Sequence, residues 1–131
     1  MRQSIIIILI IFITELKAQE PIIAWQQTIG GSGLDYFISC NQTSDNGYII
    51  GGYSYSGISG DKTEGNIGSA DYWILKLDSV GDIEWQNTIG GTSSDFLASV
   101  EQTFDGGYII GGYSKSGISG DKTELNITGG E

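Results

Sequence analysis

The sequence has no histidine, one cysteine and one proline. The absence of histidine excludes Ser-His-Asp and Cys-His catalysis, and it removes the commonest zinc ligand. Because Cys40 is the only cysteine, no disulfide can form within the chain. The composition therefore predicts neither a histidine-dependent hydrolase site nor a histidine-ligated zinc site.

Basic residues are also scarce, with 6 Lys and Arg against 16 Asp and Glu. This excess of negative charge disfavours binding to nucleic acid or to an acidic membrane surface. The longest apolar run, residues 5–13, is about half the length of a membrane-spanning helix. It follows a short basic start and precedes Ala18, a small residue suited to cleavage, so residues 1–19 are predicted to be a signal peptide. The alternative is an uncleaved anchor. After cleavage we expect no membrane insertion and a location that is secreted or on the outer cell surface.

Glycine, by contrast, is abundant, with 21 residues, and the chain repeats itself at a spacing of 60. Residues 25–31, WQQTIGG, return at 85–91 as WQNTIGG, and residues 47–54, GYIIGGYS, return unchanged at 107–114. Self-similarity of this period indicates a stacked or circular array of modules that bury their apolar faces against one another. Cys40 aligns with Val100, which favours a small buried side chain over a reactive thiol.

Each copy has the pattern of short strands between turns, and nothing in the mature chain has helical periodicity. Strands are expected at residues 37–43, 48–54, 72–78 and 83–89. In the third of these, Trp73, Leu75 and Leu77 share one face. The glycine pair at 51–52 lies inside a strand and suggests a bulge or a close backbone approach. The predicted fold is all-β, with four-stranded antiparallel meanders of about 60 residues that fit a β-propeller blade.

The repeats divide the chain into unequal parts. Residues 20–34 are predicted to be the last strand of an incomplete blade, residues 35–91 a complete blade, and residues 92–131 a truncated one. Because the second copy stops just before its third strand, we expect a fragment of a longer protein whose further repeats are missing partners. Such a fragment would leave strand edges unpaired and would oligomerise or aggregate.

Three stretches, residues 71–78, 85–91 and 102–112, resemble the tandem propeller-type repeats of large secreted or surface proteins of bacteria with a type IX secretion system. Residues 76–85 are also similar to the tryptophan-docking element of quinoprotein-type propellers. The resemblance implies a propeller-like scaffold of unassigned activity, in which Trp85 packs between blades. Trp25 and Trp73 are expected to be structural as well.

The loop at residues 56–64 is unchanged at 116–124, although loops normally vary more than strands. It carries oxygen-bearing side chains at close spacing; with their counterparts, the candidate binding residues are Ser59, Asp61, Thr63, Asn66, Ser119, Asp121, Thr123 and Asn126. Calcium loops use such spacing, usually with more carboxylates. The alternatives are a loop that satisfies its own backbone, or a contact surface for a protein or glycan. Calcium is thus one hypothesis for a cofactor, and otherwise none is expected.

Acid-base catalysis would need two carboxylates that converge in space, such as Asp35 with Asp95, or Glu84 with a neighbour. Aspartates at turns and strand ends usually act as caps, so no catalytic residue is assigned. The leading hypothesis is a non-enzymatic scaffold, secreted or on the cell surface, that serves binding or attachment. The alternatives are a non-catalytic part of an extracellular glycan-active hydrolase or lyase, and a purely architectural spacer.

Overall fold

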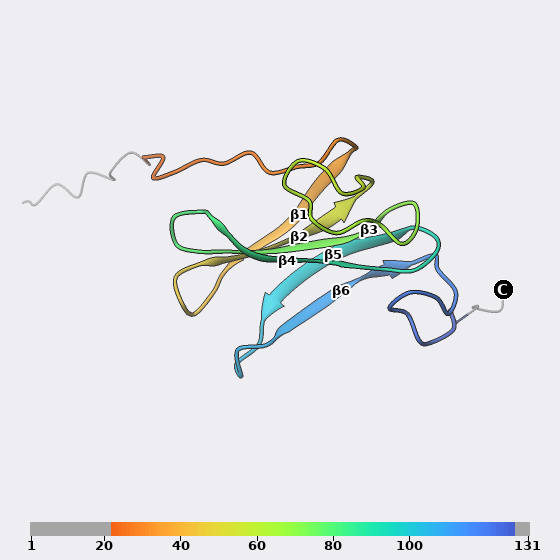
Figure 1. The fold of residues 1–131 in the computed structure, drawn as a ribbon. Helices are drawn as coiled ribbons and strands as arrows, with labels where there is room; N and C mark the ends of the chain where they lie inside the picture. Colours follow the sequence, from red (N-terminus) through yellow and green to blue (C-terminus); the bar gives the residue numbers. More distant parts are fainter. Residues whose placement is uncertain (1–21, 128–131) are drawn as a thin grey trace, which may run out of the picture.

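The structure, a computed structural model, describes residues 22–127, so the predicted signal peptide lies outside the described residues. It forms a four-stranded antiparallel sheet in the order β1-β2-β3-β4 and a separate two-stranded hairpin, β5-β6 (Figure 1). The strands are β1 (Asp35–Gln42), β2 (Tyr48–Ser54), β3 (Asp71–Leu77), β4 (Ile83–Ile89), β5 (Asp95–Gln102) and β6 (Tyr108–Ser114). The predicted all-β fold and its four-stranded meander are confirmed. The described part contains no helix long and apolar enough to cross a membrane.

The four-stranded sheet, which we call repeat 1, has two apolar faces because successive side chains of a strand point to opposite sides. The front face carries Trp73, Leu75 and Leu77, with Tyr48 and Ile50 packed beside them. The back face carries Ile49 and Ile74. Strand β2 contributes to both faces, with Ile49 on the back and Tyr48 and Ile50 on the front.

The β5-β6 hairpin, which we call repeat 2, covers the back face of repeat 1. Leu97 and Val100 of β5 form one buried cluster with Ile49 and Ile74. Tyr72 and Ile89 of repeat 1 and Tyr108 and Ile110 of repeat 2 flank this cluster. The front face of repeat 2 therefore lies on the back face of repeat 1, which is how successive modules of an array bury their apolar surface.

Both features suggested for the glycine pair in β2 are present. The register of β1 shifts between Phe37 and Ser39, which marks a bulge opposite the glycines. A Cβ placed on Gly52 would lie 1.8 Å from the carbonyl oxygen of Tyr36, so any side chain would prevent this approach. The same bulge recurs in β5 between Leu97 and Ser99.

Two expectations are wrong. Residues 22–34 form no strand, because no neighbouring strand in the described part of the chain offers them backbone partners. Cys40 is exposed rather than buried. Its counterpart Val100 is fully buried because repeat 1 lies in front of it, whereas nothing among the described residues lies in the same way in front of Cys40.

Candidate functional site

The retained loop of repeat 1 closes over the turn that precedes β1. Asp61 Oδ2 accepts a hydrogen bond from the Gly30 amide at 3.0 Å, and the Asp61 amide donates to the Gly30 carbonyl at 2.9 Å. Ser59 Oγ accepts from the amide of Ser32 at 2.9 Å. We call these contacts the clasp; its members are Gly30, Ser32, Gly33, Ser56, Ser59 and Asp61. Gly60 has a φ of 56° at this point, and a Cβ there would meet the Gly30 carbonyl at 2.3 Å.

The second copy builds the same clasp. Asp121 Oδ2 accepts from the Gly90 amide at 3.1 Å, and Ser119 Oγ accepts from the Thr92 amide at 3.0 Å. Positions 32 and 92 hold different residues, Ser and Thr. In both copies the backbone amide of this residue donates to the serine hydroxyl of the loop. The loop side chains that accept these bonds are the same in both copies, which gives the retained loop a structural duty.

The eight predicted binding residues are only partly brought together. Ser59 and Asp61, like Ser119 and Asp121, share a clasp. Asn66 instead donates to the Ser54 carbonyl at 2.7 Å, and the side chain of Thr63 is exposed. In the second copy, Asn126 accepts from Lys122 and Thr123 is exposed. Within residues 22–127 no three His, Cys, Asp or Glu side chains form a group that could hold a metal ion.

Asp35 and Asp95 organise the turn next to each clasp. Asp35 Oδ2 accepts from the Gly31 amide at 2.7 Å, and Asp95 Oδ2 accepts from the Gly91 amide at 2.7 Å. Ser56 Oγ donates to Asp35 at 3.0 Å. Each of the two carboxylates thus accepts a hydrogen bond from the turn just before its own strand, as a capping residue does.

Sequence reasoning missed Lys62, a buried lysine that joins the loop to β4. Its Nζ donates to Thr88 Oγ1 at 2.5 Å and to the Glu64 carbonyl at 2.8 Å, and it lies 5.5 Å from the centre of the Trp73 ring. Burial lowers the pKa of its amine. The signal available was the retention of a lysine inside a retained loop. Its counterpart Lys122 donates to the Ser116 carbonyl instead.

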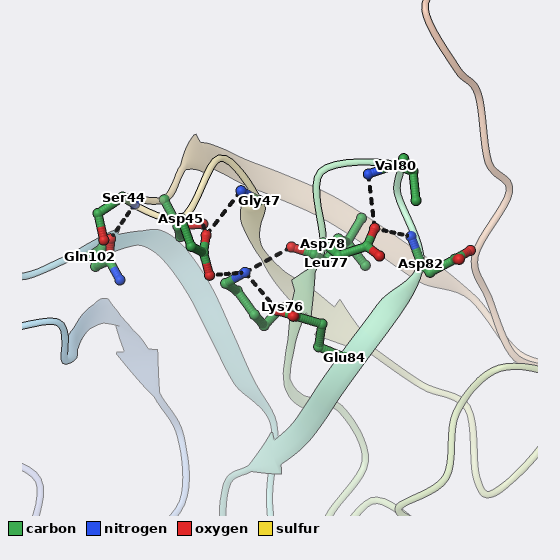
Figure 2. A network of polar contacts seen from close by, with 11 residues as sticks. Ser44, Asp45, Gly47, Lys76, Leu77, Asp78, Val80, Asp82, Glu84 and Gln102 are labelled. Atoms are coloured by element: carbon green, nitrogen blue, oxygen red, sulfur yellow. Dashed lines mark hydrogen bonds and ion pairs between the residues drawn. The ribbon is translucent and has the colours of Figure 1, made fainter.

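A second buried lysine, Lys76, lies in a polar network where the β1-β2 turn meets β3 and β4 (Figure 2). Lys76 forms ion pairs with Asp45 at 2.9 Å and with Glu84 at 2.7 Å. The Thr43 hydroxyl and the Lys76 ammonium hold the pKa of Asp45 well below its usual range. Glu84 is thus paired with the Lys76 ammonium and not with a second carboxylate. The network fastens the β1-β2 turn to β3 and β4. Ser44 extends it to repeat 2, because its amide donates to Gln102 Oε1 at 2.8 Å.

Aromatic rings run across the boundary between the repeats. Tyr36 stacks on Tyr53 at 4.8 Å, Tyr53 meets Phe96 edge-on at 4.8 Å, and Phe96 stacks on Tyr113 at 5.0 Å between ring centres. We call these four residues the aromatic strip. Tyr36 and Tyr113 are exposed. The aromatic character shared by positions 36 and 96, and by 53 and 113, was a signal in the sequence that could have revealed the strip.

The three tryptophans have different environments. Trp73 is buried in the front face of repeat 1. Trp85 lies edge-on against Tyr108 of repeat 2 at 5.4 Å, and Trp25 meets Tyr48 in the same way at 5.5 Å. Both of these rings are partly exposed, and each contacts the second strand of the repeat that follows it in the chain.

Comparison with protein-family models, with curated proteins and with solved structures gives no match. The functional argument therefore rests on the geometry of the clasps, the repeat interface and the aromatic strip.

Proposed function

We propose that this protein is a non-enzymatic repeat scaffold of the β-propeller type, secreted or on the outer cell surface, that serves binding or attachment. The observation that carries the proposal is the recurrence of the clasp in both copies. Asp61 and Asp121, the retained loop carboxylates at its centre, accept hydrogen bonds from the chain itself. Retention of the loop then reflects the building of successive repeats.

The stacking of the repeats supports the propeller-type arrangement. Ser39 and Asn41 of β1 face the backbone of β5, and Asn41 Nδ2 donates to the Val100 carbonyl at 2.7 Å. First strands of successive repeats thus lie next to each other. In a propeller the first strands of successive blades line a common axis in this way.

The surface that we assign to binding is the aromatic strip. Tyrosine rings combine a large apolar face with a hydroxyl, which suits them to contacts with sugar rings or with protein side chains. Because the strip continues from repeat 1 into repeat 2, an extended ligand such as a polysaccharide would contact several rings at once. The partner class we favour is therefore a glycan, with a protein as the alternative.

Affinity electrophoresis of the full chain through gels containing xylan, β-glucan, pectin or chitosan tests this proposal. We expect at least one polysaccharide to retard the wild-type protein, and the double variant Tyr36→Ala/Tyr113→Ala to migrate as in an empty gel. Phe104→Ala is the matched control, because Phe104 is a fully exposed aromatic residue outside the strip. Retardation that the double variant keeps would contradict the assigned surface.

The same polysaccharides separate the alternative functions. Release of new reducing ends or unsaturated sugars by a longer protein that contains this chain, but not by the chain alone, would favour the extracellular hydrolase or lyase of which the chain is a non-catalytic part. A chain that neither binds nor cleaves any of them, and that captures no surface protein, would favour the architectural spacer.

A further inference from the structure

The interface between the two repeats joins the apolar front face of one repeat to the apolar back face of the other. Leu97 and Val100 on the front of repeat 2 enter the back face of repeat 1 between Ile49 and Ile74. Val100 lies directly over Gly51, where a Cβ would come within 2.8 Å of its Cγ1. The apolar front of repeat 2 therefore packs closely on the back of repeat 1, because Gly51 has no side chain to keep Val100 away.

The front of repeat 1 has the same apolar residues without that cover. Phe37, the counterpart of Leu97, is 65% exposed, whereas Leu97 is 3% exposed. Cys40, the counterpart of Val100, is exposed as well. Phe37 also borders a hollow of about 330 Å³ whose lining includes Trp73 and Leu75 of the front face.

On the back of repeat 2 the counterpart of Ile49 is uncovered, and the described hairpin carries no counterpart of Ile74. Ile109, the counterpart of Ile49, is 62% exposed, whereas Ile49 is fully buried. Gly111 repeats Gly51, so the position that receives Val100 in the internal interface is again free of a side chain. One chain thus presents a front side at one end and a back face at the other.

We propose that these two faces bind each other between copies of this protein, so that Phe37 and Cys40 of one copy dock on Ile109 and Gly111 of the next. The internal interface is the template for this contact. Because the two faces differ, the association is head-to-tail, and it extends into a ring or an open filament rather than a symmetric dimer. The inference depends neither on the ligand nor on the cellular location.

Polar groups at the template interface sharpen the proposal. Gln102 Oε1 accepts from the Ser44 amide at 2.8 Å, and Gln42 is available to accept from the amide of Phe104 in the same manner. One position is mismatched. Asn41 donates to the Val100 carbonyl, whereas its counterpart Glu101 is a carboxylate and would face the Cys40 carbonyl of the next copy. The contact between copies is therefore weaker than the internal one, and Glu101→Asn restores the donor.

Sedimentation of the full chain over a range of concentrations tests the proposal. We expect the wild-type mass to rise with concentration, Phe37→Asp and Ile109→Asp each to remain monomeric, and Glu101→Asn and Cys40→Val to associate at lower concentration. Val80→Asp is the control, because Val80 is as exposed as Ile109, at 62%, but lies in the β3-β4 turn outside both faces. Circular dichroism verifies that each variant is folded.

Mixing the two monomeric variants is the decisive step. Phe37→Asp keeps an intact back face and Ile109→Asp keeps an intact front, so together they should form a one-to-one dimer that grows no further. In that dimer Cys40 of the Ile109→Asp partner should react more slowly with a thiol reagent. A wild-type protein that stays monomeric, or a mixture that forms no dimer, would falsify the proposal, and growth of the mixture beyond a dimer would point to pairing of strand edges instead.

Discussion

Two buried aspartates, one at the start of β3 and one at the start of β5, differ in the direction of their pKa shifts. Burial raises the pKa of Asp71, and the charge of Asp95 adds to this effect, although the amides of Gly68 and Ile67 oppose it. Burial would also raise the pKa of Asp95, but the donors around it, from Ser114, Gly91 and Ser116, outweigh burial and lower it. Ionisation of Asp71 therefore opposes folding, and ionisation of Asp95 favours it.

Asp71→Asn and Asp95→Asn should consequently change stability in opposite directions. A raised folded-state pKa means that the contribution of Asp71 to stability is present in acid and lost as the pH rises through that pKa. We expect Asp71→Asn to be more stable than wild type at about pH 7 and to lose this advantage at about pH 3. Asp95→Asn should be less stable at neutral pH, with a deficit that shrinks in acid. Urea unfolding of both variants at the two pH values measures this, and equal pH profiles would contradict it.

The clasp makes a separate prediction for Asp61. Removing the acceptor of the Gly30 amide in Asp61→Ala should cost about 1 kcal/mol, the usual contribution of one hydrogen bond. Because the carboxylate already has this internal partner, we expect the wild-type protein to melt at the same temperature in chelator and in millimolar calcium. A rise of the melting temperature in calcium, lost in an Asp61→Asn/Asp121→Asn variant, would instead assign a calcium site to the loop.

At the scale of strands, alternation and glycine placement were enough to place the sheet. The bounds expected for β2 and β4 match the observed ones, and those of β1 and β3 are displaced by one or two residues. The exposure of Cys40 could not be predicted, since a pattern shows which side chains share a face but not whether another repeat covers it. The duty of the retained loop was equally hidden, because its partners are backbone amides that carry no sequence signal of their own.

Trp85 tests how strongly one repeat holds the next. Its ring is 40% exposed and meets Tyr108 edge-on, so Trp85→Ala should cost about 1–2 kcal/mol, less than the roughly 3–5 kcal/mol of a fully buried aromatic residue. Trp73→Ala is the matched comparison and should reach the larger value, because Trp73 is buried in the front face. Denaturant unfolding of the two variants decides between these values. Equal losses would mean that Trp85 is docked as deeply as Trp73.

For the molecule as a whole, the repeats are stabilised unequally. Strands β2 and β3 are paired on both sides and contribute to both apolar clusters of repeat 1, whereas within residues 22–127 β6 is paired with β5 alone. In a repeat array stability is the sum of each module and its interfaces, so local opening should be easiest in repeat 2. We expect amide hydrogen exchange to be slowest in β2 and β3 and fastest among the strands in β6. Uniform protection across all six strands would mean that the two repeats unfold as one unit.

The clasp also bears on how such a chain can change in length over evolution. It joins Gly30 to Asp61 and Gly90 to Asp121, two pairs with the same separation and displaced by one period of 60 residues. Unequal recombination that adds or removes a whole period, wherever the crossover falls, brings an equivalent turn back to an equivalent loop and leaves the surrounding hydrogen bonds unchanged. A deletion inside residues 31–60 would change the separation of 31 residues between turn and loop. Changes by whole periods are therefore the ones that keep a clasp in every repeat.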